Sequence, residues 1–343
     1  MTPQETELYE DKARLNKQAG GKENQYSPYC DFIYYRSTIH PELTLAMKIL
    51  KPEKPSHILA STHGWHMSAP KFENLTESPK EEYLRVFVDM RGRAFSEGKP
   101  DCNGWELYDV IDAVEYVKEH YREYLLDDAL VYFEGGSGGG GNCYELLVKF
   151  PDYFAAATAL CGVTDFAVWY RGDAKGEFRD DMDIWIGKTP DEDPDAYIAR
   201  SPLYAMENLY TPLYIAHGDD DGRIPVTHSR AYVQKAGEMG RGDLVRYYEL
   251  SGVGDSSIHF KGATEGEMDE LWARSEKNRQ DHRSETVLPR RGTLKVHGYL
   301  KTKHFFVKLD RVDRWATVTY DIDRGECMVN ADSDVGYSVE WLS

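Results

Sequence analysis

The feature that most constrains this chain is a run of glycines at 135–141, inside the segment VYFEGGSGGGGNCYELLVKF. Before the run, residues 129–134 have the β-branched and aromatic character of a strand. After it, residues 144–150 read as a helix that ends at a proline. A strand that passes so directly into a helix needs a tight turn, which glycines permit. The segment therefore predicts a strand, a sharp turn carrying Ser137, and a helix.

The rest of the first 284 residues alternates between strand-like and helix-like segments. Asn103 is a candidate cap for the helix that begins near Trp105. Such alternation predicts an α/β fold, with a mostly parallel sheet covered by helices on both faces. The expected strands are 57–63, 84–90, 129–134, 154–162, 212–218 and 245–250, after an initial pair between 31 and 51, and the expected helices are 105–121, 144–150, 225–238 and about 264–282.

Four interpretations of the glycine run are considered. Gly135 to Gly139 match G-x-S-x-G, the nucleophile elbow of α/β-hydrolases, in its required strand–turn–helix setting. Gly136, Gly138 and Gly141 also fit the dinucleotide fingerprint G-x-G-x-x-G, but the next strand ends without the expected acid. A phosphate-binding P-loop is excluded because no Gly-Lys-Ser/Thr follows. A glycine-rich turn with an incidental serine remains the alternative to the elbow.

Partners for the serine occur in the order that α/β-hydrolases use, which is serine, acid, histidine. The strand PLYIAHG runs into three aspartates, Asp219, Asp220 and Asp221. Further along, the strand VRYYEL is followed by a polar glycine loop that contains His259. An acid after a strand could orient the histidine, which would take the proton of Ser137. The residues alone leave open which aspartate is the acid.

Several longer segments resemble the catalytic domain of the prolyl oligopeptidase family. They are DMRGRAFSEGKPDCNGWELYDVIDAVEYV, GGSGGGGN…FPDYFAAATALCGVTD and SPLYAMENLYTPLYIAHGDDDGRIPVTHSRAYV, within about residues 31–265. The resemblance implies an α/β-hydrolase fold, with Ser137 as nucleophile, His259 as base and Asp221 as the acid. It covers no propeller of the kind that filters peptides in many members of that family.

The domain organisation follows from these patterns. We expect an N-terminal arm at 1–30, an α/β-hydrolase catalytic domain at 31–284, and a lid-like insertion at 164–200. After residue 285 the helical period is lost, and short alternating runs are separated by polar turns. Residues 285–343 are therefore expected to form a small antiparallel β unit, which would be marginal alone and would pack on a neighbour.

Further site residues follow from the chemistry. The backbone N–H of Gly138, at a helix N-terminus, is a candidate oxyanion donor. The second donor should come from the loop after an early strand, where the Trp65 amide or the His63 ring fits. A metal site at His63 and His66 is not expected, since no third ligand is evident. Aromatic side chains that could line a substrate-binding wall are Trp65, Trp169, Tyr170 and Trp185.

Composition narrows the range of partners. The formal net charge of −18 argues against nucleic acid or an anionic membrane, because such binding depends on clustered Lys and Arg. The N-terminus has no apolar signal segment, and the five cysteines lack metal-site spacing. We expect a cytoplasmic protein with reduced thiols, no cofactor, no metal and a small-molecule ester or amide substrate. Formation of a homo-oligomer is left open.

These observations give a main functional hypothesis and two alternatives. The main one is a serine hydrolase that cleaves carboxylic esters, either of small or medium acyl groups or of acylated carbohydrate, through an acyl-enzyme. It rests on a full triad without a peptide-gating domain. The first alternative is a serine exo- or oligopeptidase, as the family resemblance implies. The second is a non-catalytic binder on the same fold.

Overall fold

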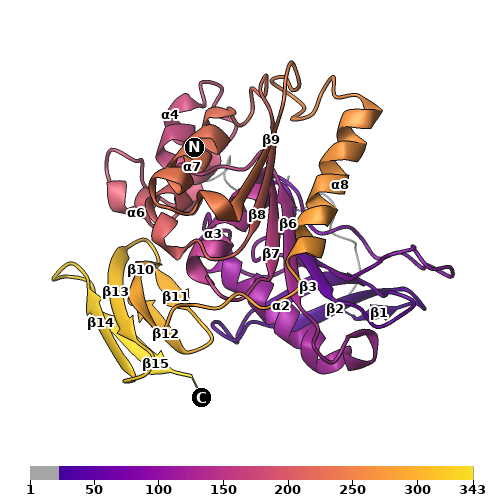
Figure 1. Ribbon diagram of the computed structural model, residues 1–343, viewed down its shortest axis with the longest axis horizontal. Coiled ribbons are helices and arrows are strands. Elements are labelled where there is room, and N and C mark those ends of the chain that lie inside the picture. The colour runs from indigo at the N-terminus through magenta and orange to yellow at the C-terminus, as the bar shows by residue number, and fades with distance from the viewer. Residues whose placement is uncertain (1–22, 343) are drawn as a thin grey trace. The chain divides into compact units, whose positions relative to one another are not determined.

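The computed structural model describes residues 23–342, and Figure 1 shows how its helices and strands follow one another along the chain. The chain divides into two compact units, 1–135 and 136–343, and each is described by itself. Residues 1–22, most of the expected N-terminal arm, lie outside the described part. The rest of that arm contains the short strand β1 (Gln25–Tyr26), which pairs with β2 (Cys30–Arg36).

The N-terminal unit contains one sheet whose described strands run in the order β1-β2-β3-β5-β4-β6. The strands up to β3 are antiparallel, β3 also pairs antiparallel with β5, and β4 lies parallel between β5 and β6. Most side chains of β2 to β6 are buried, as in a sheet whose faces are covered. Their bounds are β2 (Cys30–Arg36), β3 (Thr44–Leu50), β4 (Ile58–Ser61), β5 (Leu84–Asp89) and β6 (Val131–Gly136).

Helix α2 (Glu106–His120) follows the apolar spacing expected for 105–121, and a 3₁₀ turn at Arg122–Tyr124 comes after it. The prediction that Asn103 caps it is wrong. Asp101 accepts hydrogen bonds from the Trp105 and Glu106 amides at 2.6 and 3.1 Å. Asn103 instead adopts a left-handed conformation with φ 61°, two residues before the helix cap. The amides at the start of the helix are therefore capped by Asp101.

The C-terminal unit begins at Gly136, and its first helix starts inside the glycine run, at Gly138, and not at 144 as expected. Its parallel strands lie in the order β7-β8-β9, and Figure 1 shows α8 running along β7 and β8. The elements of this part are α3 (Gly138–Lys149), β7 (Ala156–Leu160), β8 (Leu213–Gly218), α7 (Thr227–Glu238), β9 (Val245–Leu250) and α8 (Glu265–Asp281), with 3₁₀ turns at Pro202–Tyr204, Met206–Asn208 and Gly242–Leu244.

Local sequence explains where α8 begins. The Thr264 side chain accepts from the Glu267 amide at 3.2 Å, and the Glu267 carboxylate accepts from the Thr264 amide at 2.8 Å. This capping box satisfies amides that have no partner inside the helix. On its inner face, Ser275 bonds the Thr158 hydroxyl at 2.8 Å. The helix is thereby fixed to β7.

The expected insertion at 164–200 contains three short helices, α4 (Phe166–Gly172), α5 (Arg179–Trp185) and α6 (Pro194–Ile198). Asp165 caps α4 and Asp193 caps α6, each by accepting an amide hydrogen bond three residues along.

The end of the chain folds as a six-stranded antiparallel sheet in the order β14-β13-β10-β11-β12-β15. Along β13, Ala316, Val318 and Tyr320 are buried, while Thr317 and Thr319 lie on the other face, as the alternation predicts. The strands are β10 (Arg291–His297), β11 (Tyr299–Lys301), β12 (Phe305–Leu309), β13 (Trp315–Asp321), β14 (Glu326–Asn330) and β15 (Tyr337–Trp341).

This sheet packs against the last turns of α3 through a buried polar group. Lys149 donates a hydrogen bond to the His297 carbonyl oxygen and lies 3.6 Å from the Glu145 carboxylate. The His297 ring nitrogen Nδ1 lies 2.9 Å from the same carboxylate. The three side chains are fully buried, and the Lys149 ammonium sits 4.5 Å from the Tyr299 ring centre. The antiparallel unit is therefore joined to α3 by charge as well as by apolar packing.

Two further features concern the whole described chain. Between residues 23 and 342, no helix combines the length and the apolarity that crossing a membrane requires. The five cysteines are all free thiols, four of them buried.

Candidate active site

Ser137 occupies a strained turn between β6 and α3. Its φ of 56° and ψ of −122° are unusual for a residue other than glycine, and its amide donates to the Leu160 carbonyl at 2.9 Å. The glycines after it let α3 approach the end of β7. A Cβ at Gly140 would lie 2.5 Å from the Leu160 oxygen and 2.9 Å from Gly162. The glycine run is thus required for packing as well as for the turn.

Gly138 is the first residue of α3. The first four amides of a helix have no acceptor within it, and they lie at the positive end of the helix dipole. The Gly138 N–H therefore has the location and polarity that a developing oxyanion needs.

Asp221 lies in the loop after β8 and is held by several donors. Its Oδ1 accepts hydrogen bonds from the Arg223 and Ile224 amides at 2.9 and 3.1 Å. The His217 ring nitrogen Nε2 lies 3.3 Å from Oδ2. Burial alone would raise the pKa of Asp221, but the hydrogen bonds from His217 and His259 lower the pKa to about 2. The side chain is therefore a carboxylate with a fixed orientation.

The other two aspartates have different surroundings. Asp219 accepts from the Gly252 amide at 2.6 Å and from the Ser251 hydroxyl at 3.2 Å, so it fastens the following loop. Asp220 is exposed. Asp221 is the buried member of the three.

The loop that carries His259 is bonded directly to the loop that carries Asp221. Amides of 219, 220 and 222 donate to carbonyls of 250, 253 and 255 at 2.9 to 3.1 Å. Gly254, at φ 112°, leaves room for this approach, since a Cβ there would lie 2.6 Å from the Asp221 nitrogen. Asp255 then accepts the Ser257 and Ile258 amides, both at 2.7 Å, and shapes the turn before His259. Backbone pairing thus sets the distance between the two side chains.

The three predicted residues meet at hydrogen-bonding distance. His259 Nδ1 lies 2.6 Å from Asp221 Oδ2, and His259 Nε2 lies 2.8 Å from Ser137 Oγ. A carboxylate accepts only, so the imidazole proton belongs on Nδ1, and Nε2 is left to accept the hydroxyl proton. The His259 side chain is 18% exposed, which gives solvent and ligands access. This arrangement can deprotonate a serine for attack on a carbonyl carbon.

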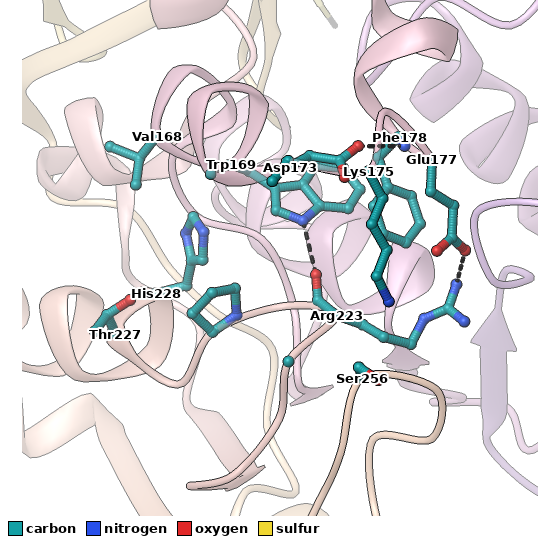
Figure 2. A pocket seen from close by; sticks show the side chains of 14 residues that line it. Val168, Trp169, Asp173, Lys175, Glu177, Phe178, Arg223, Thr227, His228 and Ser256 are labelled. Carbon is teal, nitrogen blue, oxygen red and sulfur yellow. Dashed lines mark hydrogen bonds and ion pairs between the residues drawn. The ribbon is translucent and has the colours of Figure 1, made fainter.

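A cavity of about 240 Å³ lies beside the Asp221 loop (Figure 2). Trp169 and Phe178 stack with ring centres 4.5 Å apart on its wall, and the Trp169 indole donates to the Arg223 carbonyl at 3.0 Å. The Arg223 guanidinium bonds the Glu177 carboxylate at 2.5 Å. Ser256, three residues before His259, also lines it. The cavity is therefore apolar on one side, carries an ion pair on another, and borders both catalytic loops.

The predicted aromatic wall is only partly assembled there. Trp169 lines the cavity. Tyr170 donates its hydroxyl to Asp183 at 2.8 Å, and Trp185 ends α5; neither lines the cavity. Trp65 is buried in the N-terminal unit, where its substrate-binding and oxyanion roles stay predictions.

The position of the proton on the His63 ring bears on its expected role as an oxyanion donor. Its Nδ1 lies 3.0 Å from the Gly64 carbonyl oxygen, which can only accept, so Nδ1 carries the proton. Burial lowers the pKa of His63 to about 3, and Nε2 is buried without a hydrogen-bond partner in the described chain. The neutral ring therefore presents a lone pair at Nε2, which argues against donation from that atom.

Sequence reasoning missed several residues of this site. His217 belongs to the PLYIAHG strand, and only its 3.3 Å approach to Asp221 reveals its part. Phe178 and His228 line the cavity, and burial lowers the pKa of His228 to about 4. Cys161 takes no part in the hydrogen bonds of the triad, but one of its donor atoms lies within 4.8 Å of donor atoms of both Asp221 and His259. Its position near the end of the strand expected at 154–162 was the available signal.

The fold is of the α/β-hydrolase class, and Ser137, His259 and Asp221 have the mutual geometry of a serine-hydrolase triad. Residues 82–252 match the family model described as the prolyl oligopeptidase family, so the chain contains a domain of that family. The family prediction is thereby confirmed, as is the predicted α/β-hydrolase fold with an antiparallel C-terminal unit.

Individual proteins are similar to this chain in sequence or in fold. The chain is 25% identical over 158 residues to the uncharacterized peptidase YtmA of Bacillus subtilis, covering 46% of this chain and 60% of that protein. The acylaminoacyl peptidase of Pyrococcus horikoshii is similar in structure, with TM-score 0.61, 19% identity, and 78% and 43% of the two chains covered. The Pyrococcus furiosus esterase PF2001 gives TM-score 0.53 and 12% identity over 76% and 92%. The chain thus spans less than two thirds of either peptidase.

Proposed function

We propose that the chain hydrolyses amide bonds of short peptides or acylated amino acids through a Ser137 acyl-enzyme. The observation that carries the proposal is the hydrogen-bonded series Ser137–His259–Asp221. The peptidase names of two relatives favour amides over the esters first expected from the sequence.

The roles follow from the geometry. Ser137 Oγ attacks the carbonyl carbon while His259 Nε2 takes its proton, and the imidazolium then gives that proton to the leaving amine. Asp221 keeps the imidazole proton on Nδ1 and stabilises the imidazolium. The Gly138 amide stabilises the tetrahedral oxyanion, a contribution that typically amounts to about 10²–10³ in rate. A water molecule then attacks the acyl-enzyme with His259 again as the base, which releases the acid product and restores Ser137.

The volume of the cavity supports a small substrate. Drug-sized ligands occupy pockets of about 300–1,000 Å³, so a volume of about 240 Å³ fits one side chain. The Trp169–Phe178 pair provides an apolar surface for it. The proton of the neutral His228 ring lies on Nε2, because Nδ1 accepts from the Thr164 amide at 3.4 Å.

The test compares N-acetyl-phenylalanine p-nitroanilide with the matched p-nitrophenyl ester. We expect hydrolysis of the anilide and labelling by a fluorophosphonate, both abolished in Ser137→Ala. An enzyme that is labelled and cleaves the ester but never an anilide or peptide would overturn the amide proposal and retain the hydrolase.

One observation favours ester hydrolysis as the second candidate. The match with the Pyrococcus furiosus esterase extends over 92% of that protein, whereas the acylaminoacyl peptidase is matched over 43%. The fold of this chain therefore corresponds to nearly the whole of that esterase, but to less than half of the acylaminoacyl peptidase. The ratio of kcat/KM for the two matched substrates separates the candidates.

A further inference from the structure

A buried thiol beside the catalytic residues has no part in the hydrolytic mechanism. Cys161 directly follows β7, and 2% of its surface is exposed. Its amide donates to the Ala216 carbonyl at 2.9 Å, and its φ is 42°. This backbone conformation, which is costly for a residue other than glycine, holds the thiol next to the triad.

Three different metal-donor types converge at this point. One donor atom from each of Cys161, Asp221 and His259 lies within 4.8 Å of the other two. Thiolate, imidazole and carboxylate are the ligands that Zn²⁺ takes in proteins, with bonds of about 2.0–2.3 Å. Donors at that distance lie about 3.5 Å apart in a tetrahedron, so small side-chain rotations would close the set.

We propose that Cys161, Asp221 and His259 form an inhibitory site for a thiophilic divalent cation of the Zn²⁺ type. Binding of the cation does not depend on the proposed function. Only the expected inhibition rests on the catalytic roles proposed for Asp221 and His259. Hard cations such as Mg²⁺ and Ca²⁺ prefer oxygen ligands and would not compete.

Binding of the cation is a proton-balanced ligand exchange without any redox change. The cation bonds to sulfur, the S–H bond of Cys161 breaks, and its proton goes to solvent. The Asp221 carboxylate and the neutral imidazole bind without further proton loss. Coordination at Nε2 removes the acceptor for the Ser137 proton, whereas coordination at Nδ1 moves the imidazole proton to Nε2. Either outcome stops catalysis.

The exposure of the ligands and the hydrogen bonding of the triad are both compatible with a metal ion at this site. The His259 side chain is 18% exposed and Asp221 is fully buried, so an ion would enter past the imidazole. The hydrogen bonds that join Ser137, His259 and Asp221 use no atom of Cys161. A Cys161→Ala variant, which adds no branched side chain at the positive φ of this position, should therefore keep its basal activity while losing the sulfur ligand.

The test measures metal binding and inhibition separately. Cobalt(II) added to the intact protein should produce a thiolate-to-cobalt charge-transfer absorption. Cys161→Ala should lack this band, whereas Cys30→Ala, which removes another buried free thiol, should retain it. Zn²⁺ should inhibit hydrolysis and fluorophosphonate labelling, with reversal by EDTA, and Cys161→Ala should need at least about tenfold more Zn²⁺, since loss of a ligand weakens metal sites by that order or more.

The absorption needs no substrate, so its outcome is independent of the proposed reaction. Absence of a thiolate–cobalt band in the wild type, or equal Zn²⁺ sensitivity of wild type and Cys161→Ala, overturns the proposal. If thermal melting shows that the alanine variant does not fold, Cys161→Ser replaces it under the same criteria.

Discussion

A carboxylate–imidazole pair lies near each end of α3, but the two pairs differ in almost every other respect. Beyond the N-terminus, Asp221 and His259 are 2.6 Å apart, and the free ring nitrogen reaches Ser137. Near the C-terminus, Glu145 and His297 are 2.9 Å apart and fully buried. There, His297 Nε2 and Glu145 Oε2 are buried without a hydrogen-bond partner in the described chain.

This difference shows what makes such a pair reactive. Both pairs fix an imidazole tautomer, because a carboxylate accepts from Nδ1 in each. Only the first adds a nucleophile, an accessible ring and a helix N-terminus. The second adds Lys149, whose ammonium neutralises the buried carboxylate and links α3 to the His297 carbonyl. The first pair is thus arranged for proton transfer and the second for attachment of the antiparallel sheet.

The largest expected effect comes from the nucleophile. Ser137→Ala should lower kcat by about 10⁶ without changing the unfolding free energy by more than about 1 kcal/mol, because the hydroxyl acts in the reaction rather than in packing. Single-turnover assays and urea unfolding measure the two quantities. Residual activity within tenfold of the wild type would show that another residue is the nucleophile.

The next effect belongs to the catalytic carboxylate. Asp221→Asn should lower kcat by about 10⁴, since the amide no longer holds the imidazole proton on Nδ1. Asp220→Asn, at the exposed neighbouring position, is the matched control and should leave kcat within threefold. Equal losses in both variants would contradict the assignment of the acid.

The second pair should respond in stability rather than in rate. Lys149→Met leaves the buried Glu145 carboxylate without its cation, and the unfolding free energy should fall by about 3–5 kcal/mol. Lys277→Met removes an exposed ammonium that pairs with Asp281 and should change it by less than about 1 kcal/mol. Urea titrations measure both, and kcat of the folded Lys149→Met protein should stay within threefold. A large fall in kcat would mean that the two ends of α3 are coupled.

The smallest effect is a pH dependence of stability. The pKa of Asp221 is lowered in the folded protein from 3.8 to about 2. The stabilisation by its ionised form is therefore fully present above pH 3.8 and is lost as pH falls through about 2. The difference in unfolding free energy between wild type and Asp221→Asn should shrink over that range. A difference that stays constant with pH would show that Asp221 has the same pKa folded and unfolded.

Much of this protein could be predicted from short-range patterns. The alternation of apolar segments predicted the strands and helices around Ser137, and the glycine run predicted its strained turn because few residues tolerate that backbone. The cap of α2 was predicted wrongly because a left-handed turn at Asn103 is decided by Asp101 and Glu106 together. Family resemblance, rather than pattern, selected Asp221 among three adjacent acids.

The sequence by itself determined the types of residue available for the chemistry and the elements that carry them, since periodicity and turn composition are local properties. Tertiary structure alone decided which side chains meet. The approach of Cys161 to His259, the Trp169–Phe178 stack and the approach of His297 to Glu145 join residues far apart in the chain or on separate elements. Such contacts depend on backbone pairing between loops and on packing density, which no local pattern encodes.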